Sequence, residues 1–294
     1  MTYSNRPVTD ENVWMSKRTF LKGMGFAGLG AFMPTVAFGG LPDRNEAYTT
    51  PRALTKEADK LTYNNYYEFG TGKSMWRSAQ GFDISNWELS VEGLVDNPAI
   101  FNIDELNRIG EEERIYNFRC VEAWSATVPW SGVPMKKLME HVGVQSGAKY
   151  VHFLTSDRVP IYNGFGGVYE EALTIPEAAN QLTMLATGLY GRPLERQSGA
   201  PVRLVVPWKY GFKYVKAISK IVFTDQPVTG TWDKLSSEYG FYANVNPAFP
   251  HRRWSQATER SLTTGDRIPT EIYNGYSEYV ADLYKDIPER QLFF

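Results

Sequence analysis

The 294-residue sequence has a single cysteine, three histidines and no excess of positive charge. The lone Cys120 excludes a disulfide within the chain. It also excludes a zinc site or iron–sulfur cluster built from this chain's cysteines alone, because both need several thiolates. The formal net charge is −2, from 31 basic and 33 acidic residues. This argues against a nucleic-acid partner, because nucleic-acid-binding proteins usually carry a basic excess that neutralises phosphates.

Several familiar motifs are also missing. His141, His152 and His251 do not form an HxH or HExxH pattern, which leaves a histidine-held metal site with little support. There is no G-x-S-x-G elbow of a serine hydrolase and no C-x-x-C-H haem motif. Residues 70–74, Gly-Thr-Gly-Lys-Ser, look like the end of a phosphate-binding loop, but Tyr67 stands where that motif needs glycine.

The overall composition is that of a folded globular protein. Hydrophobic residues make up 43% and charged residues 22% of the chain, which excludes a disordered, collagenous or multi-span membrane protein. The length fits one large or two small domains. Since no Pro/Gly/Ser-rich linker divides the chain after residue 63, we expect residues 63–294 to form one compact domain.

The first 40 residues have the layout of an export signal. Polar and basic residues 16–22 precede a weakly apolar, Gly- and Ala-rich run over 23–40, which is too short for a comfortable transmembrane helix. The pattern resembles a twin-arginine signal, with Lys17-Arg18 in place of the two arginines. An amphipathic N-terminal helix is the alternative. Residues 41–62 are polar and contain proline, and are predicted to be an extended lead-in to the domain.

Apolar patterning predicts an α+β fold. Strands are expected at residues 87–95, 150–155, 202–206 and 217–223, and helices near 102–106, 134–141 and 176–181. Short strands and few helices without regular alternation of the two favour α+β over a doubly wound sheet.

Cys120 follows Arg119 in an aromatic stretch. A neighbouring guanidinium is expected to lower the thiol pKa, because positive charge favours the thiolate. Three roles fit the residues: a buried small hydrophobe, a nucleophile paired with histidine, or a single thiolate ligand to a metal held mostly by another molecule. An unpaired thiol is a liability in an exported protein, which favours an occupied role.

A second candidate site is the stretch 198–216. An apolar strand is followed by a loop in which Lys209, Lys213 and Lys216 alternate with aromatic residues. Such a loop can hold an anion through its ammonium groups while aromatic faces pack on a flat ring. A solvated basic face on a hairpin is the alternative. Single-stranded nucleic acid needs similar residues, but the net charge and the export signal argue against it.

Five blocks of sequence, residues 63–70, 119–125, 199–213, 239–247 and 253–260, closely resemble the catalytic subunits of bacterial protein-methionine-sulfoxide reductases. The resemblance implies a periplasmic molybdoenzyme with the mixed-sheet sulfite-oxidase fold. Its cofactor would be molybdenum bound to one molybdopterin that carries no added nucleotide. Cys120 occupies the position of the family's thiolate ligand to the metal, which would make it both the metal ligand and the catalytic residue.

The resemblance also implies a set of cofactor-binding residues. Arg203 and Lys216 would neutralise the phosphate of the pterin, and amide and hydroxyl groups would bind its edge. Ser198 stands where a relative has asparagine, but it keeps a donor and an acceptor. The full implied set is Asn64, Tyr67, Glu68, Thr155, Ser198, Arg203, Tyr214, Val215 and Lys216.

The implied reaction is removal of oxygen from free or protein-bound methionine sulfoxide, which repairs oxidised periplasmic proteins. Electrons would come from a membrane haem-binding subunit linked to quinone. Trp124 and Trp208 are candidates for the mouth of the site, with core packing as their alternative role. Two other functions stay open at this point: oxidation of sulfite on the same fold, and non-catalytic binding of an anion by an exported protein.

Overall fold

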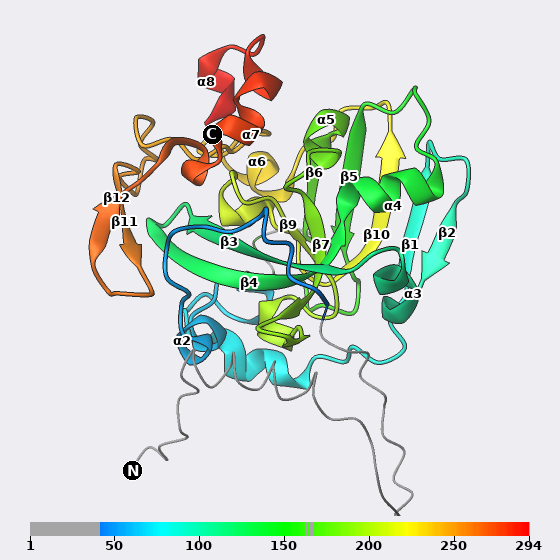
Figure 1. Cartoon of the computed structure of the whole chain (residues 1–294), viewed down its shortest axis with the longest axis horizontal. Helices are drawn as coiled ribbons and strands as arrows, with labels where there is room; N and C mark the ends of the chain where they lie inside the picture. The colour runs from blue at the N-terminus through cyan, green and yellow to red at the C-terminus, as the bar shows by residue number, and fades with distance from the viewer. Residues whose placement is uncertain (1–41, 163, 165–166, 294) are drawn as a thin grey trace, which may run out of the picture.

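The computed structural model describes residues 42–162, 164 and 167–293. The predicted export signal therefore lies outside the described residues. Two mixed sheets form the body, and short helices surround them (Figure 1). Within the described part, no helix has the length and apolarity needed to cross a membrane.

The first sheet has five strands in the order β2-β1-β10-β5-β6. Strands β1 and β10 run parallel, whereas the other neighbours are antiparallel. The bounds are β1 (Leu89–Gly93), β2 (Ala99–Phe101), β5 (Tyr150–Thr155), β6 (Glu170–Thr174) and β10 (Ile218–Thr224).

The second sheet is built on a long antiparallel pair, β3 (Glu112–Cys120) and β4 (Trp124–Pro134), which crosses the middle of the molecule in Figure 1. Its main path is β12-β11-β4-β7-β8, while β3 pairs with β4 and β9 pairs with β7. The remaining bounds are β7 (Met184–Leu189), β8 (Arg192–Pro193), β9 (Arg203–Val205), β11 (Thr258–Ser261) and β12 (Arg267–Pro269).

The helices are short, and two of them begin with a capping box. The Asn102 side chain accepts from the backbone N–H of Glu105 while Glu105 accepts from that of Asn102, and Thr174 and Glu177 repeat the arrangement. The α-helices are α2 (Glu57–Thr62), α3 (Ile103–Arg108), α4 (Met135–Val142), α5 (Ile175–Ala178), α6 (Thr231–Leu235), α7 (Ser277–Val280) and α8 (Glu289–Leu292). The 3₁₀ helices are η1 (Tyr67–Phe69), η2 (Met75–Gly81), η3 (Arg196–Ser198), η4 (Gly211–Lys213), η5 (Ile272–Gly275) and η6 (Ala281–Tyr284).

One hydrophobic cluster joins the two sheets. It includes Val91 of β1 and Phe153 of β5 from the first sheet, and Val128 and Trp130 of β4 from the second. The molecule is therefore a single compact α+β unit with mixed sheets, and the fold class predicted from sequence is confirmed.

The predicted strands at 87–95, 150–155, 202–206 and 217–223 correspond to β1, β5, β9 and β10. Strands β3 and β4 had no clear sequence signal because they are buried almost throughout, so apolar and polar residues do not alternate along them. The segment expected to be extended before residue 63 ends in helix α2.

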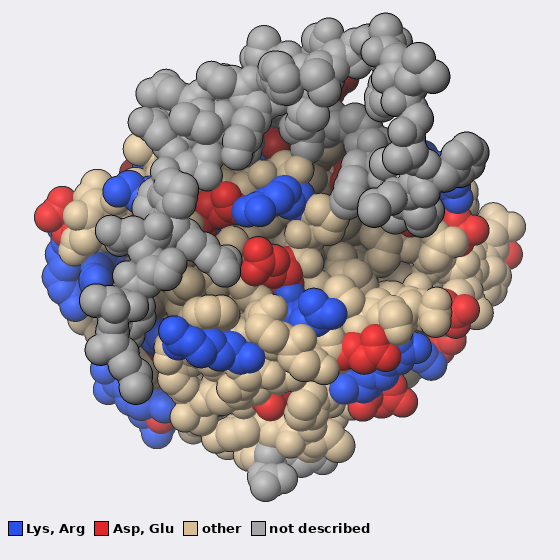
Figure 2. Space-filling model, turned by 90° about the horizontal axis from the view of Figure 1, so that it is seen from below, with Lys and Arg blue, Asp and Glu red and all other residues tan. Residues whose placement is uncertain are grey.

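On the outside, basic and acidic side chains are interspersed over the visible described part of the lower face (Figure 2). Some exposed charges form surface ion pairs, such as Lys220 with Glu92 at 3.2 Å.

Candidate active site

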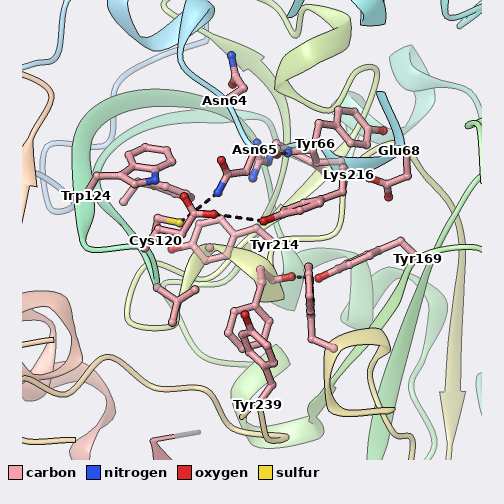
Figure 3. A pocket seen from close by; sticks show the side chains of 18 of the residues that line it. Asn64, Asn65, Tyr66, Glu68, Cys120, Trp124, Tyr169, Tyr214, Lys216 and Tyr239 are labelled. Carbon is pink, nitrogen blue, oxygen red and sulfur yellow. Dashed lines mark hydrogen bonds between the residues drawn. The ribbon is translucent and has the colours of Figure 1, made fainter. Parts of the chain in front are cut away.

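A cavity of about 840 Å³, counting the solvent at its open mouth, lies where β3 ends. The cavity is lined by the segment from Lys60 to Glu68, the residues around Cys120, the segment from Arg203 to Lys216, and the aromatic residues Tyr169, Trp232, Tyr239 and Trp254. Figure 3 shows Asn65, Cys120, Trp124 and Tyr214 facing a common space.

Cys120 is the last residue of β3 and is 5% exposed. A tight turn follows it, in which the N–H of Ala123 donates to the Cys120 carbonyl at 3.0 Å and Ala123 has a φ of 58°. The Asn65 side chain donates to Sγ at 3.4 Å. Burial, and after it the Glu122 carboxylate, raises the pKa of the Cys120 thiol to about 12.

Arg119 lowers the pKa of this thiol as expected, but burial outweighs that effect and the net shift is upward. Successive side chains of a strand point to opposite faces, so Arg119 points away from the cavity. Its guanidinium pairs with the buried Glu259 at 2.7 Å and donates to Gln256 at 2.9 Å. Its remaining effect on the thiol is weaker than that of burial. Without a bound cation the thiol is therefore protonated at neutral pH.

A polar network surrounds the cysteine. Lys73 forms an ion pair with Glu122 and also donates to the side-chain oxygen of Asn65. Tyr67 donates to Glu122 at 3.3 Å. Burial and Glu122 raise the pKa of Tyr67, which keeps its hydroxyl protonated. The carboxylate that raises the pKa of the thiol, that of Glu122, thus has a lysine partner.

Six of the cofactor-binding residues implied by the resemblance line the cavity: Asn64, Tyr67, Glu68, Arg203, Tyr214 and Lys216. Three others lie behind them. Thr155 donates to the Lys216 carbonyl at 2.9 Å, and the Ser198 carbonyl accepts from Arg203 at 2.8 Å. Val215 is a core residue whose carbonyl accepts from the N–H of Leu204.

The basic loop does not act as one unit. Lys209 and Lys213 point into the core, where Lys209 pairs with Glu177 at 2.5 Å and Lys213 with Glu171 at 2.7 Å. The expectation that all three lysines of this loop hold an anion is therefore wrong for these two. Only Lys216 of the three lines the cavity, because Glu177 of α5 and Glu171 of β6 supply carboxylates to the other two.

Arg203 and Lys216 have no such carboxylate in ion-pair contact among the described residues. Arg203 is 3% exposed and lies over the Trp130 ring at 5.0 Å. Lys216 donates to the Asn65 carbonyl and lies 4.4 Å from the centre of the Tyr66 ring. Burial lowers the pKa of Arg203 to about 10, and burial followed by Arg203 lowers that of Lys216. Two buried cations beside an open cavity indicate an anionic ligand.

Several buried hydroxyls of this region have no hydrogen-bond partner among the described residues. They are Oγ of Ser198 and the hydroxyls of Tyr66 and Tyr214. Native proteins leave few buried polar atoms unpaired, so such a cluster next to a cavity fits a polar ligand. The cations would meet a phosphate and the hydroxyls a polar ring edge, which is the chemistry of a phosphorylated pterin.

Sequence reasoning missed part of the site. Lys60, Asn65 and the rim residues Trp232, Tyr239 and Trp254 all line the cavity. No local pattern indicated Lys60, because α2 ends at Thr62 and Asn64 lies outside the helix. Trp124 lines the cavity as one alternative allowed, whereas Trp208 is fully buried in the core and donates to Tyr284 at 2.7 Å.

A buried thiol lies beside a cavity whose lining includes buried cations with no carboxylate in ion-pair contact among the described residues, which fits a protein that works with a bound anionic cofactor. Over the described residues, no group of three or more His, Cys, Asp or Glu side chains could hold a metal by itself. The chain belongs to the oxidoreductase molybdopterin-binding domain family, whose model matches residues 77–232. Its cofactor is molybdenum with molybdopterin.

Among solved structures, the chain is similar to the sulfane dehydrogenase SoxCD of Paracoccus pantotrophus. The sequences are 18% identical, and the TM-score is 0.46. The match covers 69% of this chain and 58% of the other, so this chain spans less than two thirds of the length of that protein.

Proposed function

We propose that the protein is a periplasmic reductase that removes the oxygen of methionine sulfoxide, free or within oxidised proteins. The observation that carries this proposal is the aromatic surroundings of Cys120. Glu122 is compensated by Lys73, and Trp124, Tyr239 and Trp254 supply ring faces to the same cavity. A neutral sulfoxide with a thioether product suits such a wall, since sulfur packs favourably against aromatic rings.

Cys120 would be the one protein ligand to the metal, and Asn64, Tyr67, Glu68, Arg203, Tyr214 and Lys216 would hold the pterin. Thr155, Ser198 and Val215 would support them from behind. When bound, the cofactor supplies oxygen-atom transfer, and the protein supplies binding and electrostatics.

The chain's own residues then have three tasks. Asn65 donates to Sγ of Cys120 and so orients the sulfur. Tyr67, held by Glu122, keeps a protonated hydroxyl beside the cysteine. Rim rings such as Trp232 and Tyr239, whose centroids are 5.0 Å apart, restrict water and leave an apolar entrance.

Oxidation of sulfite is the second candidate in this family, because it uses the same kind of cofactor in the opposite direction. Sulfite is an anion, and among the described residues the cavity lining around Cys120 offers it no cation without an ion-pair partner beyond those assigned to the cofactor. The deciding experiment compares two turnover assays of the molybdenum-loaded enzyme, one with methionine sulfoxide and a reduced dye, the other with sulfite and an oxidant. Faster turnover of sulfite would overturn the proposal.

Export through the twin-arginine pathway and electron supply by a membrane haem-binding subunit complete the proposal. The support for export is the charged, apolar and small-residue order of residues 16–40. Changing Lys17 and Arg18 together to glutamine should leave the protein in the cytoplasm, as followed by cell fractionation. Normal export of that double variant would contradict this part of the proposal.

A further inference from the structure

Lys60 is a buried lysine that neither the family resemblance nor the sequence patterns assigned to the site. It lies in the last turn of α2, is 3% exposed and lines the cavity together with Arg203 and Lys216. Lysine is almost never buried to this extent unless it is paired, so its position needs an explanation.

The described residues give Lys60 no carboxylate in ion-pair contact. Its ammonium donates to the side-chain oxygen of Asn64 at 3.3 Å and lies 5.9 Å from the centre of the Phe118 ring. Burial, and after it the charge of Arg203, lowers the pKa of Lys60 to about 7. The charges of Arg203 and Lys60 also lower the pKa of Lys216. Three cations are thus held close enough to repel one another.

The net charge of the cavity lining around Lys60, Arg203 and Lys216 matches that of a phosphate monoester. Apart from Glu122, which pairs with Lys73, the carboxylate in the cavity lining is that of Glu68. Three cations and Glu68 leave a net charge of about +2 when all are ionised, against about −1.5 to −2 for a phosphate monoester at pH 7. Without Lys60 the phosphate would remain only partly compensated.

We propose that Lys60 is the third cation of a phosphate cradle, with Arg203 and Lys216, that binds the phosphate of molybdopterin. Lys60 also positions Asn64, because the two side chains are hydrogen-bonded. This inference rests on the cofactor of the family and not on the identity of the oxygen donor, so it stands or falls independently of methionine sulfoxide reduction.

A structural role at the end of α2 is the competing explanation. Cations do stabilise the last turn of a helix, but they do so from an exposed position near its carbonyls, whereas this ammonium lies beside the Asn64 side chain. The two explanations predict opposite changes in the cofactor-free protein. A structural lysine stabilises it, whereas an uncompensated cation of a cradle destabilises it.

The experiment uses the full-length Lys60→Met variant, which keeps the aliphatic stem and removes the charge. Lys56→Met is the matched control, because Lys56 is exposed and is the N-cap residue of the same helix. Lys60→Arg tests rescue of the charge. Each protein is purified from two hosts. The protein from a molybdenum-replete host is analysed for its molybdenum and pterin content. The protein from a pterin-deficient host is used for thermal unfolding and for calorimetric titration with inorganic phosphate.

We expect Lys60→Met to bind inorganic phosphate at least about 10-fold more weakly, the effect of losing one charged hydrogen bond. It should also carry less pterin and unfold at the same or a higher temperature than the cofactor-free wild type. Lys56→Met should change none of these, and Lys60→Arg should restore part of the phosphate affinity. Unchanged phosphate affinity and pterin content in Lys60→Met would overturn the proposal, as would a cofactor-free Lys60→Met that is less stable than wild type or does not fold.

Discussion

Two groups of buried basic residues differ in their partners. Lys209 and Lys213 each contact a buried carboxylate, from Glu177 and Glu171. Arg203, Lys216 and Lys60 line the cavity and have no described carboxylate in ion-pair contact. The first group completes its charge balance within the fold, and the second needs a ligand. Burial alone does not distinguish structural cations from binding cations, but their partners do.

The largest expected effect comes from changing Cys120. Cys120→Ser should abolish turnover of the enzyme, because a hard hydroxyl replaces the soft thiolate that molybdenum prefers. Because the change is nearly isosteric, the free energy of unfolding should fall by less than about 2 kcal/mol. Activity assays and denaturant titration check both parts. An active serine variant would contradict the assignment of Cys120 as metal ligand.

Breaking the buried ion pair between Lys209 and Glu177 should strongly destabilise the protein. Glu177→Gln leaves Lys209 buried without a carboxylate, and Tyr284, which donates to Glu177 at 2.6 Å, loses a charged partner. We expect the free energy of unfolding to fall by about 3–5 kcal/mol. Denaturant titration of the cofactor-free protein measures it. The exposed Glu140 pairs with Lys136 at 3.9 Å, and the control Glu140→Gln should stay within about 0.5 kcal/mol of wild type.

Removing Arg203, a cation without a carboxylate partner, should lower the stability of the cofactor-loaded protein and not that of the cofactor-free protein. Loaded and cofactor-free wild type should differ in stability, by about 2.7 kcal/mol at a ligand concentration of 100 times Kd. Arg203→Met should narrow this difference by destabilising the loaded form and sparing the cofactor-free form. Thermal unfolding of wild type and Arg203→Met, each with and without cofactor, measures how much this difference in stability decreases. A cofactor-free Arg203→Met that loses as much stability as Glu177→Gln would erase the distinction between the two groups.

The smallest effect comes from a half-buried pair away from the cavity. His152 of β5 contacts Glu170 at 2.7 Å, and burial lowers the pKa of His152 despite this carboxylate. The unfolded chain therefore binds more protons just below pH 6.5, and stability rises with pH through that window and is fully present above it. His152→Gln should flatten this dependence, by less than about 1 kcal/mol. Unfolding curves between pH 5 and 8 check it, and a steeper dependence in the variant would contradict the sign.

Patterns of local origin could be predicted from the sequence. Strand β5 alternates buried and half-buried residues, and α3 begins at a capping residue, so both have a local signal. Strand β4 is buried along its whole length and has none. Most of the cofactor-binding residues implied by the resemblance do gather at one cavity, although their roles stay predictions. Lys60 and the aromatic rim were missed because they come from segments distant in sequence from Cys120.

By itself, the sequence determined that any metal of this protein has at most one thiolate from the chain, because it contains one cysteine. It also determined the α+β pattern and the family blocks. Only the tertiary structure decided which lysines are available to a ligand. Lys209 and Lys216 look alike in the sequence, but Glu177 lies opposite Lys209, whereas Lys216 lies at an open cavity. Charge compensation depends on contacts between distant residues, and such contacts exist only once the chain has folded.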